Sequence, residues 1–422
     1  MQKKYGAGYK YLILIVSTLL LAVVYITLSA WGICVGVLKD AFNLSSAQVM
    51  AGNGLLLAGY AIGSFVEGRL LGTWGWRKVF LIAMILFVGT MLLIPNVQNY
   101  NVILLLRFLQ GFGLVVTVTN SIVCGWFPST KRGLASGILL GAVALGVALG
   151  NVLTAAITPA LGWKANFYIL SIVATIGAIV FMIVVKDPPV LDEDATETED
   201  TVVIKLKPGQ SIYKSPIMIL LGLAMFCIFF NGYGQYSFLA AFMYDQGYTT
   251  SQVATVGMWN GLIGVISTPF GGWIGDVFVK KGVSAIKARA YTMGVVTFVV
   301  GTIGCLTMPY LAHINYLFAI IPALLAGWGA AAGNGPICSL PSDVFGPKIG
   351  GGAVGFILLV AGAGGVIAPI IVPYIAEATT WTIAWYVTGA AAIIGAIISF
   401  ATPSLVANNL KKAAAKEKNQ SA

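Results

Sequence analysis

The chain is poor in charge and in the residue types that build most catalytic and metal centres. Only 9% of its 422 residues are Asp, Glu, Lys or Arg, and it contains a single histidine, His313. The five cysteines fall inside apolar runs, with neither metal-ligand spacing nor the placement of a disulfide framework. No nucleophile with a neighbouring base is recognisable, so the sequence predicts a protein that is not an enzyme and needs no cofactor or metal.

Apolar residues take the place of the missing charge. Hydrophobic residues make up 58% of the chain and the mean hydropathy is +0.91, more apolar surface than a soluble domain of this size encloses. A bilayer-spanning helix needs roughly 20 apolar residues. The sequence predicts an all-α membrane protein with twelve such helices, at about 11–37, 47–70, 78–95, 101–124, 134–158, 165–186, 215–242, 252–275, 289–308, 315–337, 351–373 and 382–402.

The net charge of +10 does not indicate a nucleic-acid partner, because the basic residues are sorted by the predicted spans. With a cytoplasmic N-terminus, all of the 24 Lys and Arg residues except Lys39, Lys164 and Arg107 lie on the cytoplasmic side. This is the positive-inside pattern, and it predicts that both termini are cytoplasmic. The first apolar run is interpreted as a retained helix and not as a cleaved signal. Short loops suggest a prokaryotic inner membrane.

One long polar stretch, 187–214, divides the spans into six and six. We therefore expect an N-terminal six-helix bundle over 1–190, a cytoplasmic linker over 191–212, and a C-terminal six-helix bundle with a short basic tail over 213–422. An acidic run within the stretch is interpreted as solvated linker.

The two halves resemble one another in sequence. Residues 46–49 before the second span match 250–253 before the eighth, and 127–137 parallel 345–355 at an offset of 218. Two related halves with a binding site between them are typical of secondary transporters.

Several motifs carry a family resemblance. Gly68–Lys78 between spans two and three resembles the loop motif of the major facilitator superfamily, and Gly272–Asp276 begins its second copy. Arg107–Gly113 resembles the fourth-helix motif. Trp126–Gly137 and Ser342–Gly346 are similar to segments of oxalate/formate exchangers, monocarboxylate carriers and nitrate carriers. The resemblance implies the major facilitator fold, two pseudo-symmetric six-helix bundles working by alternating access.

The chain departs from the family pattern in the first loop motif, which in the family contributes to the cytoplasmic gate. The first loop motif has Gly72 where the family usually carries an aspartate that latches the outward-open form. Two alternatives stay open: Glu67, Arg69 and Arg132 rebuild the latch, or Asp276 of the second copy carries it alone.

Two other departures concern the cargo. Thr268 and Ala361 stand where the exchangers place basic residues, so a dicarboxylate site does not transfer. The fifth helix lacks the glycine-proline pair of drug/proton antiporters, which argues against efflux.

Arg107 is the one ionisable residue clearly inside a predicted span. Intramembrane charge is costly and is a functional candidate by default. A guanidinium binds a carboxylate through two parallel bonds, which favours an anion site, but a structural role bonded to neighbouring helices is an equal alternative. Because no Asp, Glu or His occupies mid-span, exchange or uniport is favoured over proton symport, with Glu67 as an alternative coupling group.

Polar and aromatic residues on cavity-type helices complete the candidate site, although each is individually more often a packing residue. With Arg107 they are Tyr25, Trp31, Gln110, Asn231, Tyr233, Gln235, Tyr236, Trp259, Asn260, Trp328 and Asn334. The sequence predicts a monomeric transporter in membrane lipid that carries a small organic anion, specifically a monocarboxylate, with a counter-substrate or a proton. The alternatives are an efflux carrier for amphipathic drugs or neutral metabolites, and a transporter-like receptor that binds without translocating.

Overall fold

The computed structural model describes residues 6, 8–44, 46–188 and 212–421, which form helices and turns with no strand. Twelve helical segments of 19 to 33 residues are long and apolar enough to cross a membrane. The predicted all-α fold with twelve spans is therefore confirmed. The predicted linker 191–212 lies almost entirely outside the described residues, since only Ile212 belongs to them.

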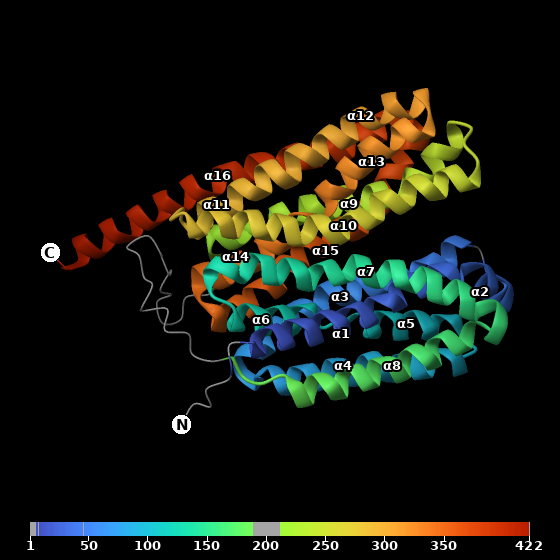
Figure 1. Cartoon of the computed structure of the whole chain (residues 1–422), viewed down its shortest axis with the longest axis horizontal. Helices are drawn as coiled ribbons and strands as arrows, with labels where there is room; N and C mark the ends of the chain where they lie inside the picture. The colour runs from blue at the N-terminus through green and yellow to red at the C-terminus, as the bar shows by residue number, and fades with distance from the viewer. Residues whose placement is uncertain (1–5, 7, 45, 189–211, 422) are drawn as a thin grey trace.

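The helices before residue 189 form one bundle, hereafter the N-terminal half (Figure 1). Glycines with positive φ, Gly75 and Gly162, allow sharp turns between successive helices there. The elements are α1 (Tyr9–Ile33), α2 (Val35–Phe42), α3 (Ser46–Trp74), α4 (Trp76–Leu93), η1 (Ile94–Asn96), α5 (Tyr100–Gly111), α6 (Val116–Trp126), α7 (Ser129–Leu161) and α8 (Trp163–Val184).

The helices after residue 211 form the second bundle, the C-terminal half (Figure 1). One of its spans contains a seven-residue π-helical stretch, η4, between α11 and α12. The elements are η3 (Ile212–Lys214), α9 (Pro216–Asp245), α10 (Thr250–Lys280), α11 (Ala285–Thr292), η4 (Met293–Val299), α12 (Val300–Ile314), α13 (Tyr316–Ala331), α14 (Asn334–Phe345), α15 (Pro347–Ala378) and α16 (Trp381–Ser421).

Spans four and ten are each broken near their middle, at positions 218 residues apart. The predicted run 101–124 is divided into α5 and α6 by a turn in which Val115 has φ +48°, a left-handed conformation that is unusual for a β-branched residue. The corresponding break between α13 and α14 falls at Gly333. The two interruptions occupy equivalent positions in the two halves. Within a bilayer, an irregular backbone is tolerated only where protein surrounds it.

The two halves touch closely at the end of the molecule where α1 begins and α16 ends, hereafter the termini end (Figure 1). On α10, a methyl group at Gly272 would collide with the carbonyl oxygen of Gly133 on α7, and one at Gly264 would press on Ala144. A methyl group at Gly257, further along the same face of α10, would meet no atom within 4 Å. The α7–α10 contact therefore ends before the opposite end is reached.

The contact between α3 and α15 is likewise close at the termini end and absent further along α3. A methyl group at Gly355 would collide with the carbonyl oxygen of Ser64, and one at Gly362 would collide with Ala61. At Gly54, two turns beyond Ala61 on α3, it would meet nothing within 4 Å. Both contacts between the halves are closed at the termini end and separate toward the opposite end.

Candidate transport site and gate

Four buried charged side chains lie together at the termini end and form an ion-pair cluster. Asp343 of α14 accepts from Arg132 of α7 (Nη1–Oδ1, 2.6 Å) and from Arg289 of α11 (Nε–Oδ2, 2.5 Å). Arg289 also lies 3.1 Å from Asp276 of α10 (Nη2–Oδ1). None of the four side chains is more than 2% exposed. Two cations and two anions balance, and their mutual attraction offsets part of the cost of burying each charge.

The ion-pair cluster joins the two halves. The backbone N–H groups of Gly133 and Leu134 donate to the Asp276 carboxylate at 3.0 and 2.7 Å. These groups belong to the second turn of α7, which begins at Ser129, and the positive end of the helix dipole favours a carboxylate nearby. Arg289 Nη2 also donates to the carbonyl oxygen of Ser129 at 2.9 Å. The termini end is thus held shut by charge-assisted hydrogen bonds between the halves.

The predicted gating residues divide between two places. Arg132 and Asp276 belong to the ion-pair cluster, but Glu67 and Arg69 take part in none of the ion pairs of the described residues. Arg69 is exposed, and its guanidinium carbon lies 5.7 Å from the ring centroid of Tyr213, which precedes α9. Partial burial raises the pKa of Tyr213, and Arg69 opposes that shift.

The sequence reasoning did not include Asp343 or Arg289 among the gating residues. A signal for Asp343 existed, because it lies in the segment Ser342–Gly346 that matched carboxylate carriers. Arg289 carried no such signal.

Arg107 lies inside the N-terminal half with no exposed surface. Its Nη1 donates to Gln110 Oε1 at 2.9 Å, and its Nη2 donates to Asn53 Oδ1 on α3 at 2.5 Å. Its guanidinium carbon lies 4.5 Å from the ring centroid of Trp31 on α1. The candidates Trp31, Arg107 and Gln110 are thus brought together, and Asn53 joins them as a residue that sequence reasoning missed.

Every described partner of Arg107 is uncharged. No acidic side chain pairs with it among the described residues, and its Nε has no hydrogen-bond partner there. A buried cation without a counter-charge is costly, and an arriving carboxylate or similar anion would supply the missing charge. Because the side chain is enclosed in this conformation, an anion reaches it only if neighbouring side chains move.

A group of tyrosines lies where the two halves meet. Tyr25 of α1, Tyr60 of α3 and Tyr233 of α9 lie close enough to one another to interact electrostatically. Tyr25 and Tyr60 are at most 5% exposed. Tyr60 is seven residues from Asn53, about 10 Å along the same helix. The predicted site residues Tyr25 and Tyr233 therefore lie between the Arg107 site and the termini end.

Three other candidates form a polar network inside the C-terminal half. Asn260 Nδ2 donates to Gln235 Oε1 at 2.9 Å, and Gln235 Nε2 donates to Asn231 Oδ1 at 3.0 Å. Asn231 Nδ2 continues the network to the carbonyl oxygen of Thr388 on α16 at 3.0 Å. Buried amides paired in this way hold helices together, so the network favours a structural role.

The remaining candidates are dispersed. Trp328 donates to the carbonyl oxygen of Val296, and the exposed Trp259 shares one face of α10 with the exposed Ile266. Tyr236, one turn from Tyr233, is 47% exposed. Asn334 begins α14 with its Oδ1 buried and unpartnered in the described part of the chain.

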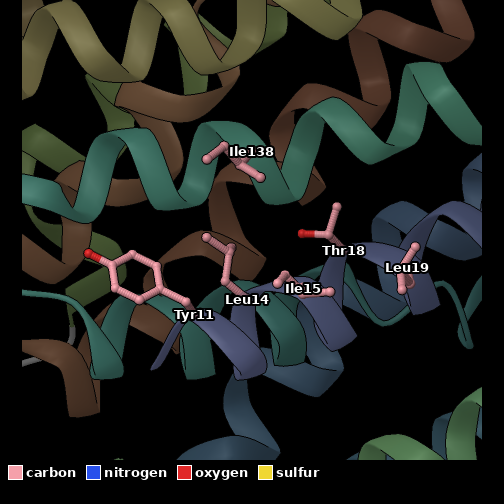
Figure 2. A pocket seen from close by; sticks show the side chains of 6 residues that line it. All are labelled: Tyr11, Leu14, Ile15, Thr18, Leu19 and Ile138. Carbon is pink, nitrogen blue, oxygen red and sulfur yellow. The ribbon is translucent and has the colours of Figure 1, made fainter. Parts of the chain in front are cut away.

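A shallow apolar pocket between α1 and α7 contains none of these residues (Figure 2). Tyr11 and Thr18 are its lining residues with hydroxyl groups, and Leu14, Ile15 and Ile138 supply apolar surface. It therefore lacks the convergent polar groups that fix an anion.

Two halves of six spans, ion-paired at one end and separating toward the other, define a membrane transporter. The chain belongs to the Major Facilitator Superfamily, because the model of that family matches residues 11–321 and 286–421. The predicted superfamily resemblance is thereby confirmed. The protein is an integral membrane transporter and not an enzyme.

Two transporters resemble this chain at low sequence identity over most of their length. The chain is 23% identical to the hexuronate transporter of Bacillus subtilis (strain 168), over 90% of this chain and 92% of the relative. It is 27% identical to the "Probable nitrate transporter NarT" of Staphylococcus carnosus (strain TM300), over 74% of this chain and 75% of the relative.

Solved structures show the same fold. The proton:xylose symporter XylE superposes with a TM-score of 0.73 at 16% identity, over 94% of this chain and 96% of XylE. The Escherichia coli fucose:proton symporter FucP superposes with a TM-score of 0.69 at 14% identity, over 93% of this chain and 99% of FucP.

Proposed function

We propose that this protein transports a small organic anion, specifically a monocarboxylate, by alternating access. The observation that carries the proposal is Arg107, a fully buried cation whose described hydrogen bonds go to the neutral side chains of Asn53 and Gln110. An anionic cargo supplies the charge that this site lacks, and a guanidinium fits a carboxylate with two parallel hydrogen bonds.

The names of the relatives support an anion. They include a hexuronate transporter, a "Probable nitrate transporter" and a 4-hydroxybenzoate transporter, and each of these named substrates carries one negative charge at neutral pH. A "Probable galactarate/D-glucarate transporter", whose named substrates carry two negative charges, is also among them. The single buried cation at the Arg107 site favours one carboxylate over two.

The conformation fits one stage of the cycle. If both termini are cytoplasmic, as the distribution of Lys and Arg predicts, the ion-pair cluster closes the cytoplasmic side and the halves separate toward the outside. Cargo then enters from outside, and the cluster must open before cargo leaves on the other side.

The test is uptake into proteoliposomes of four labelled probes: D-glucuronate, 4-hydroxybenzoate, galactarate and nitrate. We expect uptake of at least one monocarboxylate, and loss of more than about 100-fold in Arg107→Gln, because an unpaired buried carboxylate costs several kcal/mol. Arg69→Gln, at an exposed arginine on the neighbouring helix, is the matched control and keeps full uptake.

Three outcomes contradict the proposal. Undiminished uptake by a folded Arg107→Gln variant removes the anion site. A preference for galactarate removes the monocarboxylate assignment. Resistance to amphipathic drugs that is insensitive to Arg107 favours the efflux carrier instead.

A further inference from the structure

A second buried ionisable residue in the N-terminal half has no ion-pair partner among the described residues. Glu67 of α3 is only 5% exposed, and its Oε1 accepts no hydrogen bond from the described residues. It belongs to none of their ion pairs, whereas Asp276 and Asp343 are both paired with arginines. An isolated carboxylate in an apolar setting costs several kcal/mol, and adding a proton removes that cost.

Among the side chains that the structure describes, no cation pairs with Glu67. Arg69 on the same helix is exposed and stacks over Tyr213. Arg107 bonds to Asn53, which lies fourteen residues from Glu67 on α3, about 21 Å along the helix.

The described titratable group that interacts with Glu67 is a tyrosine, which is neutral at physiological pH. Tyr25 on α1 is close enough to interact with Glu67 electrostatically. Behind Tyr25 the group extends to Tyr60 on α3, Tyr233 on α9 and Cys338 on α14. On α15, which packs along α3, Gly352 and Gly355 meet this turn.

Glu67 sits where the two halves separate during alternating access. Ser64 and Gly68, on either side of it, carry the carbonyl oxygens that a methyl group at Gly355 or Gly352 would approach most closely. Opening this contact at the termini end would therefore bring water to the turn of α3 that carries Glu67.

We propose that Glu67 is the coupling residue and carries one proton across the membrane together with the anionic cargo. In the conformation closed at the termini end, the carboxyl group holds a proton taken from water on the opposite side. When α3 and α15 separate, the O–H bond breaks and the proton passes to water at the termini end. The cargo part rests on the proposed function, but the proton site does not.

The first experiment needs no cargo. Infrared spectra of the purified full-length protein are recorded while pH is varied, for wild type and Glu67→Gln. We expect a protonated-carboxyl band at neutral pH in wild type that is absent from Glu67→Gln. If neutral-pH spectra of the two proteins show the same carboxyl bands, the proposal is overturned.

The second experiment measures coupling in proteoliposomes that contain a pH-sensitive dye and receive the four labelled probes. Wild type is expected to move protons in the same direction as cargo and to accumulate cargo against its gradient when a pH gradient is imposed. Glu67→Gln should keep cargo exchange but lose both proton movement and accumulation, whereas Arg69→Gln keeps all three.

Other outcomes are also decisive. Proton movement or pH-driven accumulation that survives in Glu67→Gln overturns the proposal. If Glu67→Gln does not fold, Glu67→Asp, which keeps the carboxyl group, is expected to retain coupling with a shifted pH dependence; an unshifted dependence counts against Glu67. If wild type transports none of the probes, the proposed function fails, and the infrared result still decides the proton site.

Discussion

The protein buries arginines in two contrasting environments. At the termini end, Arg132 and Arg289 share the carboxylates of Asp343 and Asp276, and the charges balance. In the N-terminal half, Arg107 is buried as completely, but its described partners are two amide side chains and an indole ring. Arginine therefore has carboxylate counter-charges at the termini end and only uncharged described partners at the Arg107 site.

The difference distinguishes a closed gate, the ion-pair cluster, from a candidate binding site at Arg107. A balanced ion-pair cluster holds two surfaces together and has no need of a further ligand, so it fits a gate that closes one end. An uncompensated cation is less stable on its own, which is the usual condition of a site whose ligand completes it. The exposed pair of Arg77 and Asp187 provides a third environment for comparison, with side chains 43% and 67% exposed.

Removing a shared anion should have the largest effect. In Asp343→Asn, both Arg132 and Arg289 lose a carboxylate at 2.6 and 2.5 Å and stay buried. Breaking a buried ion pair costs about 3–5 kcal/mol, so we expect a marked fall in thermal stability and easier opening at the termini end. Thermal unfolding in detergent and labelling of cysteines introduced behind the gate measure the two effects. Unchanged values for both would show that the cluster does not hold the halves together.

Removing the uncompensated cation should cost far less. Arg107→Gln loses hydrogen bonds and the contact with Trp31, but it also removes a buried charge that has no counter-ion. We expect the unfolding free energy without ligand to stay within about 1 kcal/mol of wild type, or to rise. The comparison is with Arg132→Gln under identical conditions. A loss as large as that of Arg132→Gln would mean that Arg107 is a structural residue.

Breaking the exposed pair should have the smallest effect. Exposed ion pairs contribute about 0–1 kcal/mol, so Asp187→Asn should barely change thermal stability. The hydrogen bond from Arg77 lowers the pKa of Asp187, so its contribution is present at neutral pH and is lost only as pH falls through that lowered value. Stability of wild type relative to Asp187→Asn should therefore be constant from about pH 5 to 8 and converge in acid. A difference that appears near neutral pH would contradict this origin.

Hydrophobic runs were sufficient to predict the twelve spans because helices in lipid must satisfy their own backbone hydrogen bonds. The same signal did not predict the break between α5 and α6. Gly111 and Gly113 stand at the break, but glycines occur throughout the predicted spans of this chain and do not single out one turn. Nothing in the β-branched Val115 predicts its left-handed conformation.

The site was predictable only in part. Arg107, Arg132 and Asp276 were recognisable because charge is rare in a membrane protein. Their partners were not, because Asp343 pairs with an arginine 211 residues away and Asn53 resembles any other amide in a span. Conversely, the network of Asn231, Gln235 and Asn260 has the composition of a binding site, yet its groups bond mainly to each other and to backbone carbonyls.

The most direct test of the account is equilibrium binding of labelled monocarboxylates, D-glucuronate and 4-hydroxybenzoate, to purified wild type and Arg107→Gln. The account predicts saturable binding to wild type and at least about tenfold weaker binding to Arg107→Gln, equivalent to about 1.4 kcal/mol. Arg69→Gln should bind as wild type does. Equal affinities for wild type and a folded Arg107→Gln variant would contradict the claim that an anionic cargo completes the charge of Arg107.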